Sequence, residues 1–141
     1  MTSASADPAA VARSFLDAVA WAEHTHLWDL LSAPARLAVI DVATRRGMDA
    51  LRSARLREGT AADAERDEFL ADLLHGVRAD LGDIDLDAVR CVAEPEEPAG
   101  AVVVRLDADV PAALGAPVPV GTVELVSEPH LGWRVARVRS W

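Results

Sequence analysis

The sequence predicts an α+β domain in which N-terminal helices pack on a four-stranded antiparallel sheet. The main observation is a change in hydrophobic period near Gly82. Before Gly82, apolar residues recur every three to four positions, as on one face of a helix; after it they alternate, as on one face of a strand. The chain has 141 residues, of which 51% are hydrophobic, and this suffices for one core. We therefore expect a single domain over residues 8–141 and a disordered tail over residues 1–7.

The first helix is expected to begin with Asp7 as its cap and Pro8 at its first helical position, and to run to about residue 21. A second, short apolar face follows, formed by Leu27, Leu30 and Leu31.

A longer helix is expected from Ser32 and Pro34 to Gly59, although Gly47 leaves open whether it is continuous. Its apolar stripe would be Leu37, Ile40, Met48 and Leu51. A third long helix is expected from Thr60 to Gly82. Its apolar face would be Leu70, Leu73, Leu74, Val77 and Leu81.

Four strands are expected after Gly82, over residues 86–94, 101–110, 118–127 and 133–141. The second is the clearest, because valines and a leucine alternate there with charged residues. In the third strand, Pro119 and Gly121 indicate either an edge position or a bulge.

Composition excludes several classes of function. The net charge of −9 argues against binding to nucleic acid or to an anionic membrane surface. A single cysteine, Cys91, excludes an intramolecular disulfide framework. No apolar run is long enough to span a membrane and no targeting segment is recognisable, so a cytoplasmic protein is expected.

Four residue types are missing, and this restricts the chemistry. The chain contains no Tyr, Lys, Asn or Gln, a bias that a GC-rich coding sequence would also produce. A Schiff-base lysine and a tyrosine acid are therefore impossible. Any acid–base chemistry must use Asp, Glu, His, Cys, Ser, Thr or water.

Two short stretches resemble the nuclear transport factor 2-like superfamily, including its SnoaL-like and limonene epoxide hydrolase-like branches. One is the run of residues 27–36, similar to the junction of the first two helices; the other is residues 132–135, similar to the start of the last strand. The resemblance implies a curved sheet that forms a cone with the helices, an apolar pocket inside the cone, and a homodimer. Residues 35–57 depart from it, because they look helical where that fold usually has a short strand.

Arg105 and Asp107 are the first candidate catalytic residues. Two positions apart on a strand, they share one face, and an arginine can hold a carboxylate or orient water for it. The spacing is similar to the Arg-x-Asp element of limonene epoxide hydrolase-like enzymes. Those enzymes have a second Asp on the last strand, where this chain has Val135. The alternative is that Arg105 and Asp107 lie on the solvated face of the strand.

The junction between the first two helical segments supplies further candidates. Asp29 could pair with His24 or His26 as a general base, whereas the alternative is a surface or capping role. The spacing matches no metal site.

Trp28 and Trp133 could line a ligand pocket or simply pack in the core. An arginine run over residues 45–57 could bind an acidic partner, or form surface salt bridges with Asp49 or Glu58.

From these observations we expect a protein that holds a small, largely apolar molecule in the cone, without cofactor or metal. One alternative is a cofactor-independent isomerase, cyclase or hydrolase, with Asp107 or Asp29 as base, Arg105 as orienting group, and His24 or His26 as partner. Another is a non-catalytic protein-interaction module. An open cavity on which polar groups converge would favour the enzyme. An open cavity with an apolar lining would favour the ligand-binding protein. A filled interior would favour the protein-interaction module.

Overall fold

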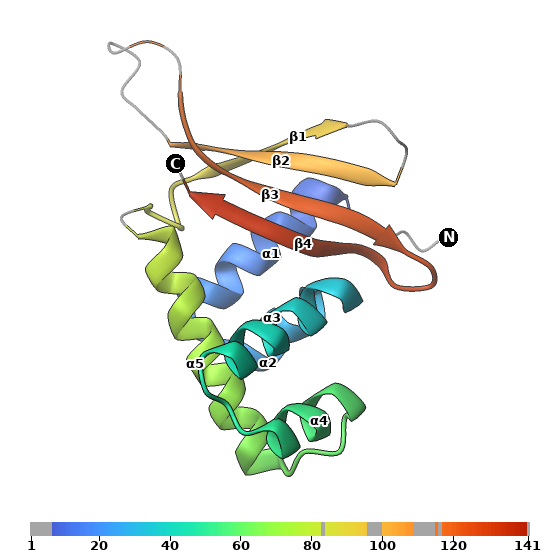
Figure 1. Ribbon diagram of the computed structural model, residues 1–141. Helices are drawn as coiled ribbons and strands as arrows, with labels where there is room; N and C mark the ends of the chain where they lie inside the picture. Colours follow the sequence, from blue (N-terminus) through green and yellow to red (C-terminus); the bar gives the residue numbers. More distant parts are fainter. Residues whose placement is uncertain (1–6, 83, 96–99, 109–114, 116, 141) are drawn as a thin grey trace.

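A computed structural model of the chain describes residues 7–82, 84–95, 100–108, 115 and 117–140. The protein is α+β, with its helices packed with a four-stranded antiparallel sheet (Figure 1). The elements in chain order are α1 (Pro8–Ala20), α2 (His24–Leu30), α3 (Ala33–Arg45), α4 (Ala50–Glu58), α5 (Asp63–Leu81), β1 (Arg90–Pro95), β2 (Ala101–Ala108), β3 (Val118–Glu128) and β4 (Gly132–Ser140).

The sheet is a simple meander in the order β1-β2-β3-β4, and the described helices lie on one side of it (Figure 1). The main core forms where α1 lies against that side. Side chains of α1 such as Phe15 and Leu16 pack with the inward-facing residues of the strands, including Val104 and Val123. The predicted fold class is therefore confirmed.

Burial along β2 alternates as predicted as far as Leu106, since Val102, Val104 and Leu106 are buried, but the alternation ends at Asp107, which is buried as well. The pairing register between β2 and β3 shifts at this point: Leu106 pairs with Gly121, but Asp107 pairs with Pro119. A side chain at Gly121 would bring its Cβ within 2.4 Å of the Arg139 carbonyl oxygen. Since β3 lies inside the sheet, the bulge interpretation is right and the edge interpretation is wrong.

The long helix expected from Ser32 to Gly59 is two helices. The break lies at Gly47, whose φ of +110° is left-handed and ends the helical path. Of the predicted stripe, Ile40 is buried, but Leu37 and Leu51 are 49% and 70% exposed. A single helical phase does not continue across the break, which accounts for Leu51. Leu37 lies before the break, on an exposed side of α3.

Two further boundaries differ from the prediction. α5 begins at Asp63, after Ala62 in extended conformation, rather than at Thr60. β1 begins at Arg90, because Ala88 and Val89 donate backbone hydrogen bonds to the Asp85 carbonyl and form a turn where strand was expected. Residues 1–6, 109–110 and Trp141 of the predicted tail and strands lie outside the described residues.

The start of α3 is fastened to the last strand. Leu31 forms an isolated parallel bridge with Val135, and Ser32 N–H donates to the Val135 carbonyl at 2.8 Å. Ala33 N–H donates to Glu128 Oε2 at 3.0 Å. Leu31 is thus an extended residue between α2 and α3. Its pairing fixes where α3 leaves the sheet.

A smaller second core holds the middle of α3. Ile40 packs with Phe69 and Leu70 of α5, and Met48 lies against this group. α4 is joined to the start of α5 by Arg55, which donates to both carboxylate oxygens of Glu65 at 2.9 and 2.7 Å. α3 is therefore held at its first residues and along one side, and its remaining face is free.

Candidate functional site

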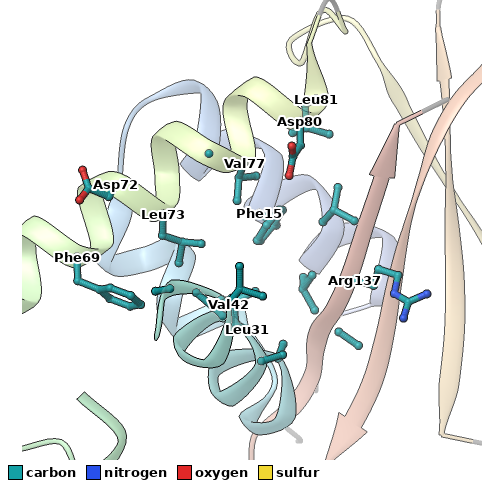
Figure 2. A pocket seen from close by; sticks show the side chains of 18 of the residues that line it. Phe15, Leu31, Val42, Phe69, Asp72, Leu73, Val77, Asp80, Leu81 and Arg137 are labelled. Atoms are coloured by element: carbon teal, nitrogen blue, oxygen red, sulfur yellow. The ribbon is translucent and has the colours of Figure 1, made fainter. Parts of the chain in front are cut away.

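A cavity of about 640 Å³ lies between α3, α5 and β4, with Phe15 of α1 at its base (Figure 2). Most of its lining is apolar. Volumes of this size are typical of sites that hold small molecules. The apolar lining consists of Phe15, Leu31, Ala35, Ala38, Val39, Val42, Ala43, Met48, Phe69, Leu73, Gly76, Val77, Leu81, Val135, Ala136 and Val138.

One face of α5 forms the first wall. Its lining residues recur at helical spacing between Phe69 and Leu81, which are about 18 Å apart along the helix axis. Leu73 and Val77 point into the centre of the cavity toward Val42 (Figure 2). The same helix turns Leu70 and Leu74 into the two cores, so a single broad apolar face serves both the core and the cavity.

α3 forms the second wall, and it is incompletely packed. Its lining residues Ala35, Val39 and Val42 follow at helical spacing. Val42 remains 38% exposed although it is apolar and faces inward (Figure 2). Ile40 packs against Phe69 and Leu70 of α5, and Thr44 is hydrogen-bonded to Ser53 of α4 at 2.6 Å, but the lining residues of α3 and α5 do not fill the space between the two helices. The result is a cavity rather than a third core.

Few polar groups border the cavity, and several already have partners. Ser140 Oγ donates to the Asp80 carbonyl oxygen at 2.6 Å. Arg52 donates from Nη2 to the Glu65 carbonyl at 3.3 Å, and its Nη1 is 3.7 Å from Glu68 Oε1. The remaining charged groups of the lining are Arg46, Asp72, Arg137 and the Asp80 carboxylate. Asp72 and Arg137 extend away from the centre (Figure 2), so the middle of the cavity is apolar.

The two strand residues proposed for catalysis lie outside this cavity. Arg105 donates from Nε and Nη2 to the two oxygens of Asp107 at 2.8 and 3.0 Å, and its Nη1 is 3.2 Å from Glu94 Oε2. They lie on the side of β2 opposite Leu106, away from the described helices. Arg105 is a third exposed there, whereas Asp107 is buried, at 6% exposure. The hydrogen bonds from Arg105 lower the pKa of Asp107, and the same bonds raise the pKa of Arg105. Each side chain therefore already has a hydrogen-bonded partner of opposite charge.

The candidates at the first helical junction also lie outside the cavity lining. His26 and Asp29 are exposed on α2. His24 Nε2 is 3.7 Å from Asp67 Oδ1, so its neighbouring carboxylate is Asp67 of α5. The four catalytic candidates Arg105, Asp107, Asp29 and His26 are thus divided between α2 and the opposite face of the sheet.

The two tryptophans proposed as ligand contacts pack beside the cavity without lining it. The Trp28 ring meets Phe69, a lining residue, edge to face at 5.7 Å. The Arg36 guanidinium lies 5.4 Å from the centre of the Trp28 ring, and its Nε donates to the Trp28 carbonyl at 3.1 Å. Trp133 is half-buried against the main core. Trp28 can therefore influence the cavity through Phe69.

The arginine run has different partners from those expected. Arg55 pairs with Glu65 and Arg52 with Glu68, both on α5, rather than with Asp49 or Glu58. The hydrogen bonds from Arg55 lower the pKa of Glu65. Arg46 and Arg52 of this run border the cavity.

The sequence reasoning missed most of the lining. Leu73 and Val77 were assigned to the apolar face of their helix, but nothing indicated that part of this face was uncovered. A usable signal existed in α3, where small and apolar residues recur at positions 35, 38, 39, 42 and 43. That pattern identifies an apolar face but not its partner.

Within the described residues, no group of His, Cys, Asp and Glu side chains is arranged to hold a metal ion. Among the described helices, none is both long enough and apolar enough to cross a membrane. Comparisons with models of known protein families, with curated proteins and with solved structures found no match. The geometry of the cavity therefore carries the functional argument.

Proposed function

We propose that this protein binds a largely apolar small molecule in the cavity between α3, α5 and β4. The observation that carries the proposal is an open space of about 640 Å³ with an apolar centre. An apolar ligand there would remove the facing side chains of Val42, Leu73 and Val77 from water. Such burial contributes about 25 cal/mol per Å² of apolar surface.

The alternatives have less support. Acid–base catalysis requires at least two polar groups that converge on one cavity, whereas Arg105 and Asp107 bind each other elsewhere. A protein-interaction module of this shape would have a filled interior. The resemblance to the nuclear transport factor 2-like superfamily agrees with the binding proposal, since its cone also holds apolar ligands.

The first test is a fluorescence titration of the purified protein with 1-anilinonaphthalene-8-sulfonate, a ring probe whose aromatic part is apolar and which carries one sulfonate. Val42→Trp would fill the centre of the cavity, and Leu37→Trp adds the same side chain to an exposed position of α3 outside the lining. We expect saturable binding at one site, at least tenfold weaker in Val42→Trp and unchanged in Leu37→Trp. If folded Val42→Trp, verified by circular dichroism, binds like the unmodified protein, the proposal fails.

A further inference from the structure

Gly76 stands apart from the other glycines of the chain. Seven of the eight have a conformational or steric reason to be glycine. Six have a positive φ, and at the seventh, Gly121, a Cβ would collide with backbone. Gly76 has neither reason, since its φ is that of an ordinary helix residue and a Cβ there would meet no atom within 4 Å. The six with positive φ are Gly47, Gly59, Gly82, Gly100, Gly115 and Gly132.

The position of Gly76 makes its presence unfavourable for the fold. It lies in the interior of α5, where glycine is a poorer helix former than alanine because it loses more backbone freedom on folding. No contact within the described part of the protein requires glycine there, since a Cβ would meet no atom within 4 Å. A residue that weakens its helix without serving the packing is a candidate for a role in binding.

Gly76 lies on the face of α5 that lines the cavity. Asp72, Leu73, Val77 and Asp80 line it too, and they are its neighbours at one, three and four positions along the helix. Because Gly76 is exposed and carries no side chain, the backbone of α5 is bare at this point of the lining.

We infer that Gly76 is a specificity-determining residue, which admits a rigid, ring-containing apolar molecule against the backbone of α5. This inference rests on the proposed function. A flexible alkyl chain can bend around a side chain at position 76 at little cost, whereas a rigid ring system cannot. Glycine at this position therefore matters most for a ligand that is wide and stiff.

The experiment compares two probes on four proteins. The ring probe is 1-anilinonaphthalene-8-sulfonate and the chain probe is dodecanoate, both measured by titration calorimetry. The proteins are the unmodified chain, Gly76→Ala, Gly76→Leu and the control Ala71→Leu, which places the same side chain on an exposed part of α5 outside the lining.

We expect Gly76→Leu to bind the ring probe at least tenfold more weakly and the chain probe within about threefold of the unmodified protein, with Ala71→Leu unchanged. Gly76→Ala should raise the melting temperature by about 3 °C while weakening binding of the ring probe. Equal loss of both probes in Gly76→Leu, or retention of the ring probe, would overturn the inference. If the unmodified protein binds neither probe, the proposed function itself fails.

Discussion

The helices α1 and α3 begin alike and end up in different surroundings. Each has 13 residues and a proline in its first turn. α1 buries six residues against the sheet and the neighbouring helices, whereas α3 buries only Ile40. The remaining apolar face of α3 borders the cavity instead of a neighbouring element.

The difference shows that an apolar helix face can serve two purposes. In α1 it drives folding, because its side chains are removed from water by the strands. In α3 Ile40 is the only buried residue and packs against α5, and other apolar residues of the helix border the cavity, where a ligand would contact them if our proposal holds. The predictions below separate these two purposes.

The largest expected effect comes from truncating each helix at its apolar face. Leu16→Ala in α1 removes a fully buried side chain and should lower the free energy of unfolding by about 2–5 kcal/mol. Val42→Ala in α3 should lower it by less than about 1 kcal/mol, because that side chain is partly exposed. Urea denaturation measures both.

The control for this pair is Ile40→Ala, which removes the one buried side chain of α3 and should resemble Leu16→Ala. If Val42→Ala were as destabilising as Ile40→Ala, the free face of α3 would be part of the core and the contrast between the helices would be lost.

The second prediction concerns the helix caps. Ser32 Oγ accepts a hydrogen bond from Ala35 N–H at 3.2 Å at the start of α3, whereas Asp7 makes no such bond at the start of α1. Ser32→Ala should therefore cost about 1 kcal/mol, and Asp7→Ala less. Thermal melts of the two variants test this order. Equal losses of stability in the two variants would mean that the hydrogen bond from Ala35 to Ser32 does not stabilise the protein.

The smallest effect is expected away from both helices, at the Arg105–Asp107 pair. Asp107→Asn should lower stability slightly at pH 7, because Arg105 is a third exposed and keeps Glu94 as a partner. The lowered pKa of Asp107 means that its contribution is complete above the ordinary carboxyl pKa of about 3.9 and is lost as the pH falls through the pKa in the folded state.

Melting temperatures at several pH values test this contribution, with Asp41→Asn, an exposed carboxylate of α3, as the control. The difference between the unmodified protein and Asp107→Asn should shrink as the pH falls below about 4, and ring-probe binding at pH 7 should not change. A difference that grows in acid would contradict the assigned role of the pair.

The sequence was sufficient for the fold class, because hydrophobic period is a local property. α1 and the alternation along β2 follow directly from it. The break at Gly47 could be suspected, but a glycine in a helical run does not reveal its φ. The exposure of Leu51 could not be predicted, since it depends on the direction that the chain takes after the break, and that of Leu37 depends on which side of α3 the rest of the protein covers.

The cavity was less accessible to sequence reasoning than the fold. It exists because α3, α5 and β4 stop short of filling the space between them, and no single segment encodes that distance. Arg105 and Asp107 drew attention because their chemistry is visible in the sequence. Gly76 did not, because the role that we propose for it depends on an absent side chain.

The bond between Ala33 and Glu128 joins residues 95 positions apart. Closing so long a loop costs entropy before any contact compensates for it, so such pairings form late in folding. During synthesis, the start of α3 has no strand to dock on until β4 has emerged. We therefore expect the cavity to take shape only after β4 has been made, and truncation of the final strand to abolish it even if the early helices still form.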